Sequence, residues 1–359
     1  MSTTEYKAGL SIEDLPNKLQ KKRPLKLASN ENPLGSSPLA LQAIRDNLET
    51  VHIYPAKQIE MQLRQVLATF LGNQLTPEHI VIGSGGIEVL EFVARSYLTT
   101  PDAESVLPRQ TFPFFARYNG RTQQKINFYD LDAEDFSYSP EKIMAAITPK
   151  TKMVYVCNPN NPTGDIMSAT MLHQLIEMLP DDVLLVHDEA YYEFVDSPDY
   201  PDTMPYVLAN KNVFIMRTFS KIYGLAGLRL GYGIASPQII ERVASVKRNF
   251  HVNKLALVAG LAALKDDDHK QRTIANNAVG KQWLTEHLRQ LNCHVWPSQA
   301  NFLLFSHAQM PASVIINGLM AEAIIVRPAF GLDNHIRLSI GTPAQNERLI
   351  ETLTAVLSI

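Results

Sequence analysis

The amino-acid sequence predicts an α/β fold with a mostly parallel sheet, followed by a smaller α+β domain. Three observations lead to this prediction. Over the first two thirds of the chain, short apolar runs repeatedly pass through polar loops into segments of helical periodicity, a pattern typical of a parallel sheet covered by helices. The last third changes to helices followed by short strands. With 359 residues, the chain is also too long for one simple core.

The segments before the sheet are an arm and two helices. Residues 1–35 are predicted to form an irregular arm, because its end, ASNENPLGSSP, is rich in turn-forming residues. Helical spacing then predicts a helix over 38–50, after a Ser37-Pro38 start, and another over 59–72, which stops at Gly72.

The sheet is predicted from four apolar runs that end in polar or small residues. These runs begin the segments 79–86, 151–164, 182–194 and 212–221, and two of them lead into helical segments at 87–98 and 169–179. In parallel sheets, ligands bind at the carboxyl ends of the strands. We therefore expect the functional site at that edge of the sheet.

The last third is predicted to form the smaller domain. Helical segments at 237–250, 255–266 and 279–291 come before short strands at 294–298, 301–307, 323–328 and 335–342. The predicted division of the chain is an N-terminal arm that joins the small domain over 1–35, a large domain over 36–245 and a small α+β domain over 246–359.

The composition argues against several classes of protein. The net charge of −3 leaves no basic excess for nucleic acid. The polar start MSTTEYKAGLSIEDL has no apolar signal core, and no apolar run reaches membrane-spanning length. Cys157 and Cys293 are the only cysteines, too few for a disulfide framework and without metal-ligand spacing. We therefore expect a cytoplasmic protein that holds no metal and contacts no membrane.

Polar and small residues at the strand ends form the candidate site. They are Gly83-Ser84-Gly85-Gly86, Asn158 to Gly164, Asp188, Tyr191, Ser220, Lys221 and Arg229. Each has an ordinary explanation when it is taken singly. The glycine and asparagine-proline runs fit turns, Asp188 and Glu189 fit solvated charges, Arg229 fits a surface ion pair, and most lysines are exposed.

Together, the same residues describe the parts of one ligand. A glycine turn at a helix start offers N–H groups to an anion, and Ser220 and Arg229 add a hydroxyl and a cationic fork for a phosphate. Lys221 can form a Schiff base with an aldehyde, and Asp188 can keep a pyridine nitrogen protonated. An asparagine and a tyrosine can donate to a phenolate oxygen. Phosphate, aldehyde, pyridine and phenolate together describe pyridoxal 5′-phosphate.

The sequence resembles the fold-type I pyridoxal-phosphate-dependent aminotransferases, and most closely the histidinol-phosphate aminotransferase group. The resemblance runs nearly end to end and is carried by six motifs: SNENPLG at 29–35, YP at 54–55, NPNNPTG at 158–164, DEAY at 188–191, TFSKIYGLAGLRLGY at 218–232 and IRLSIGT at 336–342. It implies an aspartate-aminotransferase-like fold with a three-layer large domain. It also implies a homodimeric enzyme of amino-acid biosynthesis.

The resemblance implies a catalytic role for Lys221, Asp188 and Tyr191. Lys221 would hold the cofactor and shuttle a proton, Asp188 would pair with its pyridine nitrogen, and Tyr191 would contact the ring oxygen together with Asn161. The other implied cofactor contacts are Gly85, Gly86, Ile87, Thr218, Ser220 and Arg229 around the phosphate, Phe112 stacked on the ring, and Tyr54 reaching the partner subunit's cofactor. The implied substrate contacts are Arg337, Arg327, Asn32 and Tyr6.

The implied reaction is transamination between histidinol phosphate and a 2-keto acid, with 2-oxoglutarate as the expected acceptor and ping-pong kinetics. Three positions depart from the group: Ile87 and Ala56 stand where Asp is common, and Phe112 stands where Tyr is common. None removes a group that transamination needs, because Ile87 keeps its backbone N–H and Phe112 can still stack. They leave open an aromatic or other amino acid as substrate.

Three further alternatives remain at this point. A close relative decarboxylates O-phosphothreonine on the same scaffold, and Arg337 suits that substrate too. A dinucleotide-binding oxidoreductase fits poorly, because GSGG lacks the required spacing and the glycines at 224–233 follow Lys221. A non-catalytic binding protein predicts the loss of Lys221 or Asp188, and both are present.

Overall fold

A computed structural model describes residues 11–13, 15–72 and 74–358 of the chain. Its larger part is built on a seven-stranded sheet with the strand order β2-β8-β7-β6-β5-β3-β4. The strands are β2 (Ile80–Gly83), β3 (Glu104–Pro108), β4 (Ile126–Tyr129), β5 (Thr151–Cys157), β6 (Leu184–Asp188), β7 (Val213–Thr218) and β8 (Gly231–Ile234). Only β8 runs antiparallel to its neighbours, so the predicted α/β class with a mostly parallel sheet is confirmed.

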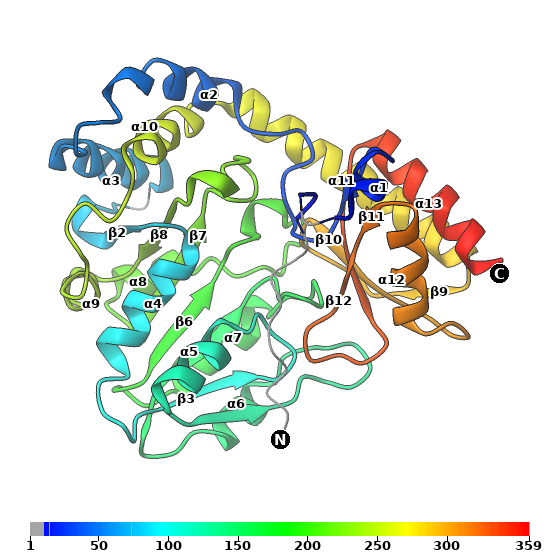
Figure 1. Ribbon diagram of the computed structural model, residues 1–359. Coiled ribbons are helices and arrows are strands. Elements are labelled where there is room, and N and C mark those ends of the chain that lie inside the picture. The colour runs from blue at the N-terminus through cyan, green and yellow to red at the C-terminus, as the bar shows by residue number, and fades with distance from the viewer. Residues whose placement is uncertain (1–10, 14, 73, 359) are drawn as a thin grey trace.

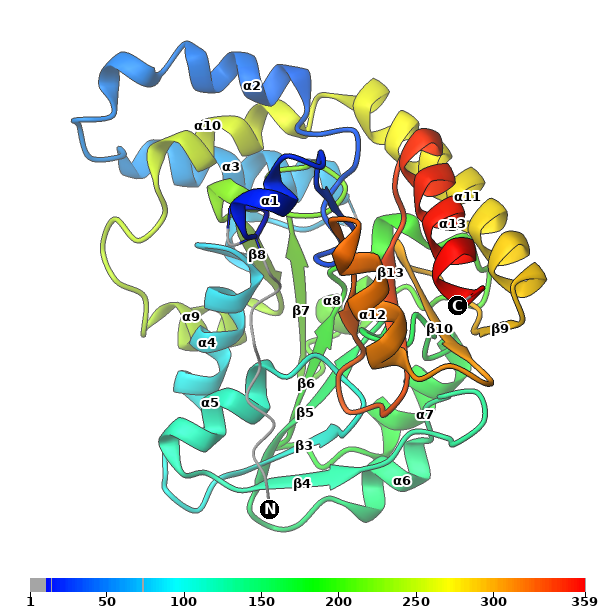
Figure 2. The same ribbon diagram turned by 45° about the vertical axis from the view of Figure 1, so that its right-hand side comes forward.

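Helices cover both faces of this sheet, because its buried strands alternate between two apolar clusters. Along β5, Val154 and Val156 belong to one cluster, while Met153, Tyr155 and Cys157 belong to the other. The second cluster is covered by α4 (Gly86–Tyr97), α5 (Phe114–Thr122) and α9 (Pro237–Ala244). In Figures 1 and 2, α4 and α5 lie against this side of the sheet.

The opposite face carries a larger set of helices. They are α2 (Pro38–Arg45), α3 (Lys57–Leu71), α6 (Pro140–Ala145), α7 (Ala169–Met178), α8 (Met204–Leu208) and α10 (Lys254–Ala263). The start of α2 is set by Ser37, whose side chain accepts from the Ala40 N–H at 3.2 Å. The predicted stop at Gly72 is confirmed, because α3 ends there at a positive φ of 68°.

Three strands of the sheet were not among the predicted runs, namely β3, β4 and β8. For β8 the reason is local, since its sequence GYGI is rich in glycine, which is uncommon in strands. Gly233 must lack a side chain because a Cβ there would lie 2.1 Å from the Phe214 ring. The tight packing of the sheet therefore selects residues that sequence patterns treat as turn formers.

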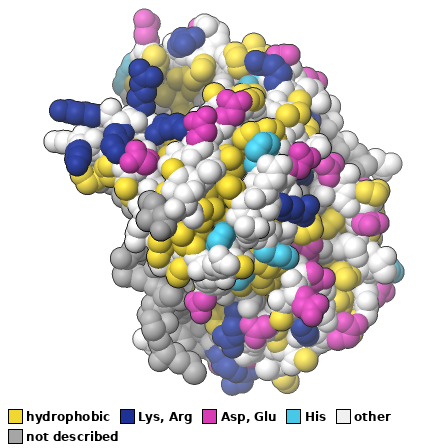
Figure 3. Space-filling model, turned by 90° about the vertical axis from the view of Figure 1, so that its right-hand side faces the viewer, with side chains coloured by type: hydrophobic (Ala, Val, Ile, Leu, Met, Phe, Trp, Pro, Cys, Tyr) yellow, Lys and Arg dark blue, Asp and Glu magenta, His cyan; other side chains and the backbone are white. Residues whose placement is uncertain are grey.

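The smaller part contains a four-stranded antiparallel sheet of order β12-β13-β10-β9. Its elements are α11 (Asp267–Gln290), β9 (Cys293–Val295), β10 (Phe302–His307), α12 (Ala312–Ala321), β11 (Ile324–Ile325), β12 (Arg327–Pro328), β13 (Ile336–Ser339) and α13 (Pro343–Leu357). Over most of the face in Figure 3, acidic and basic side chains are interspersed.

The described part of the arm packs on the smaller part. After α1 (Asn17–Gln20), the strand β1 (Leu25–Lys26) pairs in parallel with β11. The helix α10 lies after the predicted boundary at residues 245 and 246, but it packs on α2 and α3, as Figures 1 and 2 show. The bounds of the two domains stay a prediction. Short 3-10 helices complete the chain: η1 (Leu48–Thr50), η2 (Pro77–His79), η3 (Tyr192–Phe194) and η4 (Ala226–Leu228). Within the described ranges, no helix has the length and apolar character needed to span a bilayer.

Candidate active site

The candidate site begins at the carboxyl ends of two adjacent parallel strands. Asp188 is the last residue of β6, and Thr218 is the last residue of β7. Asp188 is paired in register with Met216 on β7, so the two strand ends lie side by side. Lys221 follows three residues after β7. The sheet therefore brings the predicted acid and the predicted lysine to one edge.

Asp188 is a buried carboxylate with two neutral donors. Its Oδ2 accepts from the Tyr155 hydroxyl at 2.6 Å, and its Oδ1 accepts from the Ala190 N–H at 3.0 Å. Burial, which disfavours the charged form, raises the pKa of Asp188 to about 6. The two hydrogen bonds oppose that rise, and with a pKa of about 6 the carboxyl group is mostly ionised at neutral pH.

Lys221 is partly buried and donates from Nζ to the Ser29 carbonyl at 3.0 Å. Removal from water, reinforced by the positive charge of Arg337, lowers the pKa of Lys221 to about 7. A substantial fraction of the amine is therefore neutral at physiological pH. A neutral lysine amine can act as a nucleophile or as a base.

A network of polar side chains surrounds the Tyr191 hydroxyl. This oxygen accepts from Asn30 Nδ2 at 3.1 Å and from Asn161 Nδ2 at 3.3 Å. The Asn161 Oδ1 in turn accepts from Arg337 Nη1 at 2.6 Å. Burial raises the pKa of Tyr191 above its ordinary value, so the hydroxyl keeps its proton. The structure thus brings together four residues that lie far apart in the sequence.

Arg337 and Arg327 lie side by side on adjacent strands of the small sheet. They are paired in register between β13 and β12, which places both side chains on one face. The Arg327 Cζ lies 4.3 Å and the Arg337 Cζ lies 5.5 Å from the centre of the Phe330 ring. Two guanidinium groups beside one aromatic ring suit an anionic group of a ligand.

A second cationic feature stands at the start of α4. Gly85 is the N-cap residue and has a φ of 85°, a conformation that favours glycine. A Cβ at Gly85 would lie 2.3 Å from Arg229 Nη2, so the guanidinium lies directly against this turn. Nearby, Thr218 donates from Oγ1 to Ser220 Oγ at 3.0 Å. The helix start and the guanidinium together favour an anion here.

Phe112 and Ile87 are brought together at a cavity of about 420 Å³ between α4 and α5. Phe114 and Tyr118 add aromatic walls, and Glu91 contributes a carboxylate. The two departures Ile87 and Phe112 therefore face the same space. Gly86, at the first position of α4, cannot carry a Cβ because it would lie 2.6 Å from the Met216 sulfur.

Tyr54 lies at the surface, away from this network. The Tyr54 side chain is 76% exposed and stacks on Phe250 with 4.7 Å between the ring centroids, so its contact with a partner subunit stays a prediction. Tyr6 lies outside the described residues.

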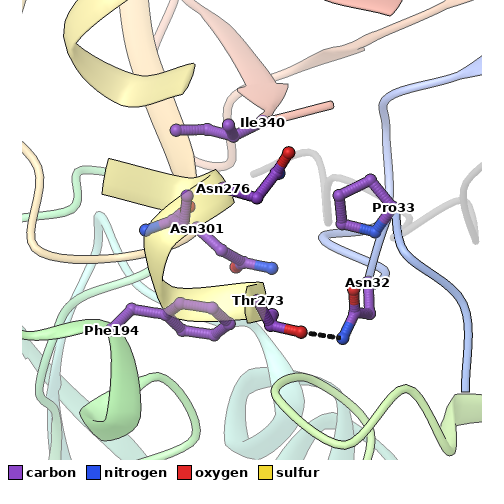
Figure 4. Close-up of a pocket in the computed structure, with 8 residues that line it drawn as sticks. Asn32, Pro33, Phe194, Thr273, Asn276, Asn301 and Ile340 are labelled. Carbon is purple, nitrogen blue, oxygen red and sulfur yellow. Dashed lines mark hydrogen bonds between the residues drawn. The ribbon is translucent and has the colours of Figure 1, made fainter. Parts of the chain in front are cut away.

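Asn32 turns toward α11 instead of Tyr191. Its Nδ2 donates to the Ile222 carbonyl at 2.9 Å and to Thr273 Oγ1 at 3.1 Å. Figure 4 shows Asn32 next to Thr273 of α11 at the wall of a small pocket, which Asn276 and Asn301 also line. A contact between Asn32 and the substrate stays a prediction.

Sequence reasoning missed Asn30 and Tyr155. Asn30 lies in the same SNENPLG motif as Asn32, with a φ of 53°, and its backbone N–H donates to Ser339 Oγ at 2.8 Å. The motif contains two asparagines, and the spacing alone does not say which of them turns inward. Tyr155 sits inside a strand and has an ordinary core pattern.

Comparisons with known proteins give matches over nearly the whole chain. The family model described as "Aminotransferase class I and II" matches residues 22–353. The chain is 40% identical to histidinol-phosphate aminotransferase of Moorella thermoacetica, over all of this chain and 92% of the relative. It is 38% identical to that of Brevibacillus brevis, over 98% of this chain and 96% of the relative.

A solved structure shares the fold along its whole length. It is the histidinol-phosphate aminotransferase from Sinorhizobium meliloti in complex with pyridoxal 5′-phosphate, which has a TM-score of 0.87 and 26% sequence identity. The match covers 99% of this chain and 98% of that chain.

Proposed function

The chain belongs to the class I and II aminotransferases, and from this premise we propose that it transfers the amino group of histidinol phosphate to a 2-keto acid. The observation that carries the substrate is the 40% identity, over the full length of this chain, to a relative named for that activity. The proposed acceptor is 2-oxoglutarate, and the proposed order of events is ping-pong.

The enzyme uses pyridoxal 5′-phosphate, which supplies an aldehyde that combines with amino groups and a ring that draws electrons from the substrate's Cα. The residues of the site suit this group. The Gly85 turn has space only for a bare backbone beside Arg229, which suits a phosphate. Asp188 has neutral donors and can accept a charged ring N–H.

The proposed holding residues follow from these features. The phosphate would be held by Ser220, Thr218, Gly85, Gly86, Ile87 and Arg229. Asp188 would hold the ring nitrogen, and Asn161 and Tyr191 the ring oxygen. Phe112 would cover the ring face, since an aromatic side chain stacks on a flat ring.

Lys221 is the proposed proton carrier. Its pKa of about 7 leaves the Nζ lone pair available at physiological pH, so Nζ can accept the substrate's Cα proton and return it to a neighbouring carbon. General base catalysis is most effective when the pKa of the base lies near the working pH. The Ser29 carbonyl, 3.0 Å from Nζ, orients the amine.

Arg337 is the proposed anchor for the anionic end of each substrate. Histidinol phosphate offers a phosphate, and 2-oxoglutarate offers a carboxylate, and a guanidinium pairs well with both. Arg337 is held by Asn161 Oδ1 and the Ala28 carbonyl, each at 2.6 Å. Arg327, across the strand pair, would add positive charge to the same pocket.

A homodimer is proposed on the ground of an exposed apolar surface. Its residues are Leu48, Val51, Ile53, Tyr54 and Phe250, all more than half exposed. Exposed apolar groups gathered in this way mark a protein–protein contact. Sedimentation analysis would give a dimer mass, and charged replacements at Val51 and Ile53 would shift it to that of a monomer.

A cytoplasmic location is proposed because Cys157 and Cys293 are both free thiols.

The proposed substrate is tested by following the absorbance of the bound cofactor during titration with histidinol phosphate and then with phenylalanine. Bleaching at low histidinol phosphate concentration, with little response to phenylalanine, supports the proposal. An equal or stronger response to phenylalanine would make the enzyme an aromatic or broad-specificity aminotransferase. Release of carbon dioxide from O-phosphothreonine without a keto acid would point to decarboxylation instead.

A further inference from the structure

The carboxylate of Asp188 accepts a hydrogen bond from Tyr155, a side chain of the neighbouring strand β5. Cys157 is paired in register with Asp188, and Tyr155 lies two residues earlier on the same face of the sheet. From that position its hydroxyl extends along the strand to Asp188 Oδ2, at 2.6 Å. The Tyr155 ring is fully buried and packs edge-to-face on Phe115 of α5, with 5.0 Å between centroids.

This arrangement divides the acceptor sites of Asp188 between protein and ligand. The Tyr155 hydroxyl and the Ala190 N–H each occupy one carboxylate oxygen. A carboxylate has about four acceptor sites in total, so capacity remains for a donor that comes from a bound molecule. Burial raises the pKa of Tyr155 well above its ordinary value, so its hydroxyl remains a donor at any working pH.

We propose that Tyr155 is a positioning residue of the cofactor site: its hydroxyl holds Asp188 ionised and aimed at the ring nitrogen of the cofactor. This inference rests on the proposed function, because the partner assigned to Asp188 is the cofactor ring. Tyr155 itself touches neither substrate nor cofactor in this assignment. Its effect is transmitted wholly through the Asp188 carboxylate.

The alternative is that Tyr155 merely fills the core. The chain offers a matched control in Tyr138, which is 2% exposed and donates from its hydroxyl to the Cys157 carbonyl at 2.7 Å. Tyr138→Phe removes a buried hydroxyl from the same neighbourhood but leaves the Asp188 donors in place. Any general effect of losing a buried hydrogen bond is shared by both variants.

The pH dependence gives the sharpest readout. The titratable groups that interact electrostatically with Asp188 are Tyr155 and Cys157 on β5, Lys221 after β7, and Tyr191, His187 and Glu189 on its own segment. Of these, Tyr155 is the one whose side chain donates to the carboxylate. Losing that donor raises the pKa of Asp188 further, so pairing with a ring cation begins to fail at a higher pH.

The experiment measures the binding of pyridoxamine 5′-phosphate to the full chain freed of cofactor, from pH 5 to 8. This compound has the ring and phosphate but no aldehyde, so its binding does not need a bond to Lys221. Tyr155→Phe is expected to weaken binding about tenfold at neutral pH and to move the acid limb of the profile up by about one pH unit. Tyr138→Phe is expected to match the wild type within about twofold.

Two further measurements keep the outcome specific. An analogue with carbon in place of the ring nitrogen is expected to bind wild type and Tyr155→Phe equally well. Replacement of Tyr155 by 3-fluorotyrosine, which fills nearly the same space and is a stronger donor, is expected to move the acid limb down. That second replacement carries the test if the phenylalanine variant does not fold.

Different failures have different meanings. A wild-type chain that binds neither compound would overturn the proposed function. A wild-type chain that binds normally, while Tyr155→Phe and Tyr138→Phe behave alike, would overturn only the role of Tyr155. The same conclusion would follow if Tyr155→Phe weakened the nitrogen-free analogue as strongly as pyridoxamine 5′-phosphate.

Discussion

Asp188 and Glu189 are adjacent in the sequence and both are buried, yet their side chains have different partners and their pKa values shift in opposite directions. On one side, the Asp188 carboxylate accepts from a hydroxyl and an N–H, and burial raises its pKa to about 6. On the other side, Glu189 Oε2 accepts from Arg217 Nε at 2.8 Å. Burial opposes ionisation there too, but the Arg217 charge outweighs it and lowers the pKa of Glu189 to about 2.

The difference separates an acid that is paired within the protein from one that keeps its charge free for a ligand. Glu189 has its cation built in, and Thr203 and His187 satisfy its other oxygen. Asp188 has only neutral donors among the described residues, so its charge remains available to a cation that arrives with a ligand. The ordinary alternative for both acids, a solvated surface charge, is excluded because their side chains are almost fully buried.

The largest expected effect lies at Lys221, next to the Asp188 side. Lys221→Ala should lower turnover by about 10⁴-fold or more, because the chain then lacks the amine that we propose both holds the cofactor and acts as the base. Activity assays with histidinol phosphate and the absorbance of the bound cofactor would measure this. Full turnover in the variant would remove the assignment of Lys221.

Replacing Asp188 tests whether its side is the working side. Asp188→Ala should lower kcat by about 10³-fold, or about 4 kcal/mol, since the ring nitrogen would lose the counter-charge that we propose for it. Some cofactor should remain bound through the phosphate. Steady-state kinetics alongside a cofactor titration would separate the two effects, and an unchanged kcat would contradict the role.

Replacing Glu189 should have the opposite profile. Glu189→Ala leaves the Arg217 guanidinium buried without its carboxylate, which should lower the free energy of unfolding by about 4 kcal/mol. Cofactor affinity in the molecules that remain folded should change little. Urea unfolding and cofactor titration would measure both quantities. A variant that is stable but does not bind cofactor would break the proposed division between the two acids.

The stability of the cofactor-free protein should carry opposite pH signatures from the two acids. The folded-state pKa of Asp188 is raised from 3.8 to about 6, so its contribution to stability is present below pH 4 and is lost as the pH rises through 6. For Glu189 the folded pKa is lowered from 4.5 to about 2, so its contribution is present above pH 4.5 and is lost as the pH falls through 2.

The Asp188 window is the accessible one. Between pH 4 and 6, Asp188 should cost the cofactor-free protein about 3 kcal/mol of stability, and Asp188→Asn should remove that slope. Urea unfolding at several pH values would measure it. A slope that persists unchanged in the variant would assign it to another group.

The smallest expected effect lies at Arg337, which we propose contacts the substrate and not the cofactor. Arg337→Ala should raise the KM for histidinol phosphate about 30-fold, or about 2 kcal/mol, through the loss of a charged pair. Cofactor affinity should fall much less. An equal loss in both would place this arginine at the cofactor, and Arg327→Ala provides a comparison from the opposite strand.

Much of the fold was readable because apolar periodicity reports directly on burial. The runs that became β2, β5, β6 and β7 are continuous and apolar, as strands buried on both faces must be. The strands β3, β4 and β8 were not predicted. In β8, the glycines that allow close approach to Phe214 and Gly86 also hide the strand pattern.

The candidate site was readable where one residue type is required by the chemistry. A lysine after a strand, an aspartate at the end of another and a glycine at a helix start each have few chemical substitutes, so the motifs show them. Asn30 and Tyr155 could not be found in this way. Their roles come from where their side chains point, and many residues of the same type serve only turns or cores.

The sequence by itself determined the α/β class and the chemical groups available to the site, because strand periodicity and side-chain chemistry are local properties. Tertiary structure alone decided which groups meet: Asn30 turns to Tyr191, and Asn32 turns to α11. It also decided the pKa of each acid, because it places Arg217 beside Glu189 and the Tyr155 hydroxyl beside Asp188. A pKa depends on burial and on neighbours brought from other strands, and no local stretch of sequence contains them.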